Sequence, residues 1–292
     1  MVLMVNGLFK SINKVNILKD ISFSINENEI LGLIGPNGSG KSTIMKCIAG
    51  LYHPTSGEIT INGYDIDKDR VNALSNMGVS IEYPALYPNI TDNDHFKMVA
   101  KWKKLDKSRI KEMEDFSGLN DELKKEVRQY SMGMKQRLIL SLAMMTKPKL
   151  LILDEPTKGL DPQAIIDLRK KLLDIRNDGT SILLSSHQLS EVDKLVDRII
   201  FIKDGQLIAH KTIDELHQKH ISCIKTSDNQ YAKKILKDYI VTNDNEYIRL
   251  ECGSDNDFSN VINLLVKNNI SIYSIEDKGE DLEKYYQNLY QG

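Results

Sequence analysis

Residues 35–43 read Gly35-Pro36-Asn37-Gly38-Ser39-Gly40-Lys41-Ser42-Thr43 and fit the pattern G-x-x-x-x-G-K-[ST]. The glycines allow successive backbone N–H groups to point inward around anionic oxygens, and a helix that follows the loop adds its positive N-terminus. The pattern therefore predicts a phosphate-binding loop. We expect Lys41 to reach the β- and γ-phosphates of a nucleotide and the Ser42 hydroxyl to ligate Mg²⁺.

The segments on either side of this loop have the character that such a loop requires. An apolar strand is expected at residues 29–34 and a helix at residues 42–51. At average composition, a chance match to the motif in a chain of this length is of order 1%. An ordinary glycine turn is therefore a poor explanation of the pattern.

A second group of candidate residues follows the apolar run Leu-Leu-Ile-Leu at 150–153, which is typical of a strand at the centre of a parallel sheet. Asp154 and Glu155 come directly after it, at the carboxyl edge where open α/β sheets bind ligands. We expect Asp154 to hold Mg²⁺, directly or through water, and Glu155 to orient or deprotonate an attacking water. An isolated Asp-Glu pair is more typical of a solvated loop, but the preceding strand and the separate phosphate loop favour the catalytic interpretation.

Apolar runs and helical patterns alternate over the first part of the chain, which predicts an α/β layered fold. Residues 91–127 are rich in Lys, Asp and Glu with helical periodicity, so we expect a helical subdomain inserted at about 84–146. Further strands are expected at residues 2–9, 21–25, 58–61, 78–82, 181–184, 199–202 and 206–209, and further helices at 133–145, 162–176 and 189–195.

The pattern changes after about residue 218, where the expected order of elements becomes β-α-β-β-α-β-α and resembles a small ferredoxin-like module. We expect a nucleotide-binding domain at 1–218 and an accessory α+β domain at 219–292. The strands of the second domain are expected at 221–225, 239–242, 247–251 and 270–275, and its helices at 231–237, 258–266 and 282–289.

Composition excludes several classes of protein. The 292 residues carry 39 Lys and Arg against 41 Asp and Glu, a net charge of −2. Because non-specific nucleic-acid affinity depends on a basic surplus, we expect no nucleic-acid partner. The 3 Cys are far apart, which argues against disulfides and zinc. The chain has no apolar run of about 18 residues and no signal-like start, so we expect a soluble, cytosolic protein.

Two classes of nucleotide-binding protein lack support in the sequence. GTPases read guanine with an N-K-x-D tetrapeptide, whereas Asn13-Lys14-Val15-Asn16 ends in the wrong residue. The loop signatures of protein kinases do not occur either.

Three further motifs resemble those of ABC ATPases. They are Tyr130-Ser131-Met132-Gly133-Met134-Lys135-Gln136-Arg137, Gly159-Leu160-Asp161 and Ser185-Ser186-His187. Together with the phosphate loop and the paired acids they follow the order of that family over residues 2–215. The resemblance implies a P-loop ATPase domain with a mixed sheet, a RecA-like core and a helical subdomain, and it implies ATP and Mg²⁺ as cofactors.

The resemblance also assigns roles to single residues. Ser131 and the N–H group of Gly133 would cap the γ-phosphate of ATP bound to an opposite subunit, so that two chains enclose two ATP molecules. Asp161 would bridge that interface. His187 would contact the γ-phosphate and help to arrange the attacking water.

Three departures from the family pattern are informative. Glu82 stands where the family has glutamine, and a glutamate at this position resembles the "E-loop" of bacitracin-resistance and lantibiotic-immunity exporters. A carboxylate is a harder, charged ligand for Mg²⁺ or water than an amide. The alternative is that the exchange is merely tolerated. Met132 and Met134 replace a glycine and a glutamine of the signature. Ile12 aligns with the aromatic residue that stacks on adenine, unless the register shifts and Phe9 takes that place.

The resemblance predicts an ATPase at the inner face of a bacterial membrane that powers a separate permease. A second ATPase subunit, expected to be another copy of this chain, would complete the site. The segment at residues 83–89 and the helical insert would receive the permease. Export of lantibiotic or bacitracin-like peptides is the expected activity, and a multidrug or other small-molecule exporter is the alternative. A soluble ATPase acting on DNA or ribosomes and a non-catalytic subunit fit less well.

Overall fold

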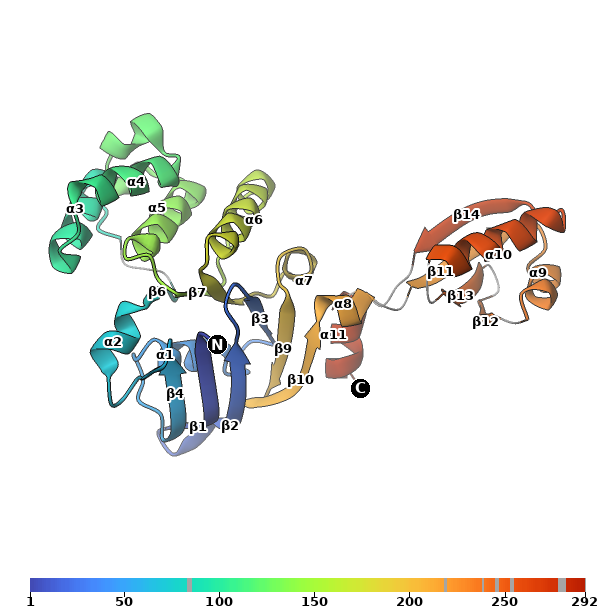
Figure 1. Ribbon diagram of the computed structural model, residues 1–292, viewed down its shortest axis with the longest axis horizontal. Helices are drawn as coiled ribbons and strands as arrows, with labels where there is room; N and C mark the ends of the chain where they lie inside the picture. Colours follow the sequence, from blue (N-terminus) through green and yellow to red (C-terminus); the bar gives the residue numbers. More distant parts are fainter. Residues whose placement is uncertain are drawn as a thin grey trace. The chain divides into compact units, whose positions relative to one another are not determined.

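The computed structural model describes residues 1–82, 86–217, 220–237, 239–244, 247–252, 255–277 and 282–291. The chain divides into two compact units, Met1–His210 and Lys211–Gly292, whose elements are labelled in Figure 1. The expected boundary between residues 218 and 219 lies outside the described residues, so the domain limits of 1–218 and 219–292 stay a prediction. Within the described ranges, none of the helices is both long and apolar enough to cross a membrane.

The first unit is built on a six-stranded sheet in the order β10-β9-β3-β8-β7-β6. The pairs β3–β8, β3–β9, β7–β8 and β6–β7 are parallel. Strands β3, β7 and β8 are buried along their whole length, which explains why their sequences are apolar runs without alternation. The strands are β3 (Ile30–Ile34), β6 (Met77–Ser80), β7 (Leu150–Asp154), β8 (Ser181–Ser185), β9 (Arg198–Lys203) and β10 (Gln206–Thr212).

A second sheet packs into the same core and has the order β2-β1-β4-β5. Its neighbouring strands are antiparallel. It consists of β1 (Leu3–Ile12), β2 (Val15–Ile25), β4 (Ser56–Ile61) and β5 (Tyr64–Asp65). The two sheets and their helices give the mixed α/β fold that the sequence predicts.

The helices of the first unit fall into two groups. Beside the sheets lie α1 (Lys41–Ile48), α2 (Arg70–Ser75), α6 (Pro162–Asn177) and α7 (Leu189–Val192). A separate helical group contains α3 (Asp92–Lys103), α4 (Lys107–Ser117), two short 3₁₀ turns (Asn120–Lys124 and Val127–Gln129) and α5 (Met132–Met144). This group has its own apolar core around Phe96, Met113 and Leu138. Its helix α5 contacts β6, where a Cβ atom at Gly78 would lie 2.4 Å from the carbonyl oxygen of Ala143.

The second unit contains an antiparallel sheet in the order β12-β13-β11-β14. Ile224, Leu250 and Val261 are among the residues of its separate core. After α8 (Ile213–His217), its elements are β11 (His220–Thr226), α9 (Asn229–Ile235), β12 (Ile240–Asp244), β13 (Tyr247–Cys252), α10 (Asp255–Lys267), β14 (Ile272–Asp277) and α11 (Leu282–Gln291). From β11 onward this is the β-α-β-β-α-β-α order expected from the sequence.

Some expected boundaries are wrong. Strand β1 continues to Ile12, beyond the expected end at Phe9, and it contains register shifts after Val5 and Leu8. These shifts interrupt the two-residue alternation by which a half-buried strand is recognised. Helix α7 ends at Val192 instead of residue 195, and the short helix α2 was not expected.

Candidate functional site

The phosphate loop connects β3 to α1 and depends on its glycines. A Cβ atom at Gly35 would lie 2.3 Å from the carbonyl oxygen of Ile202. Gly40, the N-cap of α1, has a φ of 110°, a conformation that residues with a side chain rarely adopt. Only glycine therefore fits at both ends of the turn that leads the chain into the helix.

Polar groups of the loop are available to an anion. Pro36, Asn37 and Gly38 are exposed, whereas the Ser39 hydroxyl is buried and has no hydrogen-bond partner among the described residues. Ser42 and Thr43 lie in the first turn of α1. An unsatisfied buried hydroxyl next to a helix N-terminus has the character of an anion site.

Lys41 is folded back onto the loop that precedes it. Its side-chain Nζ donates to the carbonyl oxygens of Gly35 at 2.7 Å and Pro36 at 3.0 Å. Burial lowers the pKa of Lys41, and the charges of Glu155 and Asp154 oppose this shift. These two charges connect the loop electrostatically with the paired acids.

The acids lie at the carboxyl end of β7, next to the end of β8. Asp154 pairs with Ser185 across the two parallel strands, and the Ser185 hydroxyl donates to Asp154 Oδ1 at 2.5 Å. Glu155 has a φ of 52°, and its N–H donates to the hydroxyl and carbonyl oxygens of Ser185 at 3.0 and 3.2 Å. His187 Nδ1 lies 2.6 Å from Glu155 Oε2.

Sheet order explains why these groups meet. Strands β3, β8 and β7 are consecutive neighbours and run parallel, so their carboxyl ends share one edge. The phosphate loop follows β3, His187 follows β8, and Asp154 and Glu155 end β7. One edge of the sheet thus collects a cationic loop, two carboxylates and an imidazole.

Glu82 lies just after β6, but its side chain is directed to α1. Its Oε1 is 2.5 Å from the Nζ of Lys46, and this hydrogen bond is the main cause of the raised pKa of Lys46. Lys46 also lies over the ring of Tyr52, 5.4 Å from its centre. The segment at residues 83–89, which is expected to receive the permease, includes residues 83–85, and these three lie outside the described residues.

The predicted residues of the signature motif and of the loop before α6 form a second group. Ser131 caps α5 and accepts a hydrogen bond from the N–H of Met134 at 3.2 Å. Asp161 caps α6 and accepts one from the N–H of Ala164 at 2.9 Å. A Cβ atom at Gly133 would lie 3.4 Å from Ala164 Cβ, so the two helix starts are adjacent.

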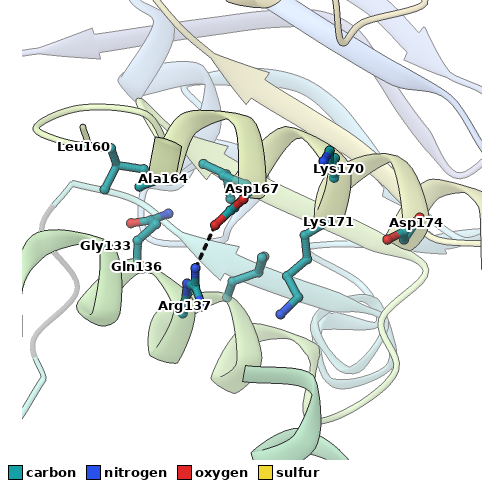
Figure 2. Close-up of a pocket in the computed structure, with 11 residues that line it drawn as sticks. Gly133, Gln136, Arg137, Leu160, Ala164, Asp167, Lys170, Lys171 and Asp174 are labelled. Carbon is teal, nitrogen blue, oxygen red and sulfur yellow. Dashed lines mark hydrogen bonds and ion pairs between the residues drawn. The ribbon is translucent and has the colours of Figure 1, made fainter. Parts of the chain in front are cut away.

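A cleft of about 270 Å³ separates α5 from α6 behind these two helix starts (Figure 2). Arg137 of α5 and Asp167 of α6 bridge it with a 2.8 Å ion pair. Lys171 of α6 donates to the carbonyl oxygen of Phe116 and lies over its ring. These contacts join the core helix α6 to the helical group that carries the signature motif.

Ile12 is the one predicted site residue still to be placed. Ile12 ends β1 and pairs with Val15 at the start of β2. The sequence motif that contains Ser185 indicates no separate role for this residue, and no pattern in the sequence connects Lys46 with Glu82. A serine at the end of an otherwise apolar strand was the available signal for Ser185.

The fold and site define the ATP-binding subunits of ABC transporters, and comparisons with known proteins agree. The family model described as "ABC transporter" matches residues 18–158. The chain belongs to the ATP-binding proteins of ABC transporters, which bind ATP and use its hydrolysis to drive transport.

Two relatives place the chain more closely. It is 42% identical to the lantibiotic transport ATP-binding protein SrtF of Streptococcus pyogenes over 73% of this chain and 91% of that protein. It is 33% identical to the bacitracin transport ATP-binding protein BcrA of Enterococcus faecalis over 98% and 95%. A solved structure of an ATP-binding subunit of an ABC transporter matches with a TM-score of 0.69 and 31% identity, over 74% of this chain and 92% of that one.

Proposed function

We propose that this chain hydrolyses ATP at the shared edge of β3, β8 and β7 to power the export of lantibiotic or bacitracin-like peptides through a separate membrane permease. The observation that supports the catalytic part is the meeting of the phosphate loop, Asp154, Glu155 and His187 at that edge. The names of the relatives SrtF and BcrA support the cargo.

Phosphate binding starts from the groups that the loop leaves unsatisfied. The Ser39 hydroxyl and the N-terminal N–H groups of α1 receive phosphate oxygens. Lys41 exchanges its two carbonyl partners in the loop for the β- and γ-phosphates, a stronger charge-assisted interaction. This exchange offsets the burial that disfavours the lysine cation in the free protein.

The oxygen donors at the site suit Mg²⁺, which prefers hard oxygen ligands and retains several waters. Ser42 supplies a hydroxyl and the largely buried Asp154 a carboxylate. Within the described residues no cluster of three metal-binding side chains occurs, which fits a cation held jointly by a few protein oxygens and phosphate. When bound, Mg²⁺ neutralises charge that develops on the phosphates.

Glu82 is the third proposed metal or water ligand and must first leave Lys46. The pair is largely exposed on the glutamate side, and exposed ion pairs contribute at most about 1 kcal/mol. Rotation of Glu82 toward the nucleotide is therefore inexpensive.

Glu155 and His187 act on the attacking water. The Glu155 carboxylate orients the water or accepts its proton. His187 holds Glu155 through Nδ1, which leaves Nε2 to contact the γ-phosphate.

A second copy of the chain completes each site. Ser131 and Asp161 are exposed at their helix starts, and Ser131, Gly133 and Asp161 form a group distinct from the phosphate loop. In the proposed dimer, Ser131 and Gly133 of one copy cap the γ-phosphate bound to the other, and Asp161 bridges the interface. The subunit lies at the inner face of the cell membrane against its permease, with residues 83–89 and the helical group as the contact region.

A resistance assay tests the cargo. Deletion of the coding sequence is expected to sensitise the cell to at least one member of a lantibiotic and bacitracin panel, and wild-type protein but not Glu155→Gln should restore growth. Sensitisation only to unrelated drugs would favour a multidrug or other small-molecule exporter. Copurification with RNA or DNA instead of a membrane protein would contradict a transport role.

A further inference from the structure

We propose that Ser185 is a positioning residue that sets the metal-binding acid and the water-activating acid with a single hydroxyl group. The inference rests on the proposed roles of Asp154 and Glu155. Ser185 has no exposed surface, so solvent does not compete for its hydrogen bonds.

The hydroxyl has a donor and an acceptor function, and each is directed to a different acid. Its proton goes to Asp154 Oδ1 at 2.5 Å, and its oxygen accepts the backbone N–H of Glu155 at 3.0 Å. A serine hydroxyl has one proton and two lone pairs, whereas an ionised carboxylate only accepts. The directions of both hydrogen bonds are therefore fixed.

The first bond orients the Asp154 carboxylate. A short hydrogen bond to an ionised acceptor is stronger than a neutral one, and here it holds Oδ1. Oδ2 then remains uncommitted to Ser185 and can serve the cation site in one defined rotamer. Outer groups that orient a metal ligand typically change metal affinity about 10- to 100-fold when removed.

The second bond holds the backbone of Glu155 in an uncommon conformation. Its φ of 52° is disfavoured for a residue with a side chain and persists where surrounding contacts impose it. The hydroxyl and carbonyl oxygens of Ser185 both receive the Glu155 N–H. This conformation places Oε2 of Glu155 at 2.6 Å from His187.

Ser181 provides a matched control on the same strand. It is equally buried, and its hydroxyl donates to the carbonyl oxygen of Asn26 at 2.8 Å. It begins β8, whereas Ser185 ends it. Ser181→Ala thus removes a buried serine hydroxyl from β8 without touching the acids.

The experiment compares the full chain with Ser185→Ala, Ser185→Thr and Ser181→Ala. Binding of Mn²⁺ with a non-hydrolysable ATP analogue is followed by electron paramagnetic resonance, and ATPase activity is titrated with Mg²⁺. For Ser185→Ala we expect about tenfold weaker Mn²⁺ binding and an equal rise in the half-saturating Mg²⁺ concentration. At saturating Mg²⁺, kcat should still fall about tenfold, with little change in KM for ATP.

Ser185→Thr keeps the hydroxyl and should restore Mn²⁺ affinity to within about threefold, while Ser181→Ala should leave it unchanged. Mn²⁺ affinity of Ser185→Ala within twofold of wild type would overturn the proposal, as would an equal loss in Ser181→Ala. Asp154→Asn distinguishes a failure of the proposed metal role of Asp154 from a failure of the positioning role of Ser185. If Asp154→Asn and Ser185→Ala both bind Mn²⁺ normally, the proposed metal role of Asp154 fails. If Asp154→Asn binds Mn²⁺ weakly and Ser185→Ala binds it normally, only the positioning role of Ser185 fails.

Discussion

Asp92 gives a prediction about pH and stability that can be worked out from the structure. It is the first residue of α3 and has no exposed surface. Burial raises the pKa of its carboxyl group from 3.8 to about 7, and the nearby Tyr130 hydroxyl offsets part of this rise. The N-terminus of a helix favours a carboxylate by about 0.3–1 kcal/mol, so the burial effect is the larger one.

The sign follows from the raised pKa. Between about pH 4 and pH 7 the folded protein retains a proton on Asp92 that the unfolded chain has released, so this group makes the protein less stable as the pH rises. Below pH 4 the penalty is absent, and above pH 7 it is complete. From pH 5 to pH 8 these two pKa values give a loss of about 2–3 kcal/mol.

Asp92→Asn removes this titration and keeps the shape of the side chain. We expect the variant to gain about 2–3 kcal/mol over wild type between pH 5 and pH 8. Urea unfolding at both pH values, followed by circular dichroism and by the fluorescence of Trp102, the single tryptophan, measures the difference. Trp102 lies on α3 but is 67% exposed, so circular dichroism carries the measurement and the tryptophan signal only accompanies it.

Asp94 on the same helix is the control, because a hydrogen bond from the Thr91 hydroxyl lowers its pKa. Its stabilising contribution is present above its unfolded pKa and is lost as the pH falls, so Asp94→Asn should give no gain at pH 8. The reasoning about Asp92 is refuted if Asp92→Asn and wild type differ by the same amount at pH 5 and pH 8.

Three further predictions concern the nucleotide site and the core around α1. Gly35→Ala should abolish ATP binding in a filter assay, because the new Cβ would lie 2.3 Å from the Ile202 carbonyl oxygen; normal affinity would contradict the described loop. Glu82→Gln should leave the melting temperature nearly unchanged, because the ion pair with Lys46 is exposed on the glutamate side and exposed pairs contribute little to stability. The same variant should raise the half-saturating Mg²⁺ concentration for ATPase activity; an unchanged concentration would make Glu82 a neutral exchange. Cys47 should resist a thiol reagent at pH 8 in the native protein and react after unfolding. Burial raises the pKa of its thiol to about 11, and the thiolate is the reactive form. Fast labelling of the native protein would show that the core around α1 opens.

The sequence predicts the site best where a motif directly follows a single apolar strand. Strands β3, β7 and β8 are apolar runs that end in the phosphate loop, Asp154 and Glu155, and Ser185 to His187. Because parallel strands end at a common edge, the motifs alone indicate that these groups meet.

Other features depend on contacts between segments that are distant in sequence. Lys46 and Glu82 are 36 residues apart, and the sequence around either residue does not indicate the other as its partner. The double hydrogen bonding of Ser185 requires the register of β7 against β8, which a sequence does not specify. Asp92 looks like an ordinary acidic residue of a helix start until the packing of the helical group buries it.

We propose that Glu155 activates the water that attacks ATP bound between two copies of this chain. Glu155→Gln retains the shape of the side chain but removes its ability to accept a proton, and general base catalysis typically contributes 10²–10⁴-fold. The decisive measurement is light scattering of the variant with Mg²⁺ and ATP, with phosphate release followed in the same sample. We expect a stable ATP-dependent dimer whose turnover is at least about 100-fold below wild type. Sustained hydrolysis would contradict the role of Glu155, and an inactive variant that stays monomeric with bound ATP would contradict the dimeric site.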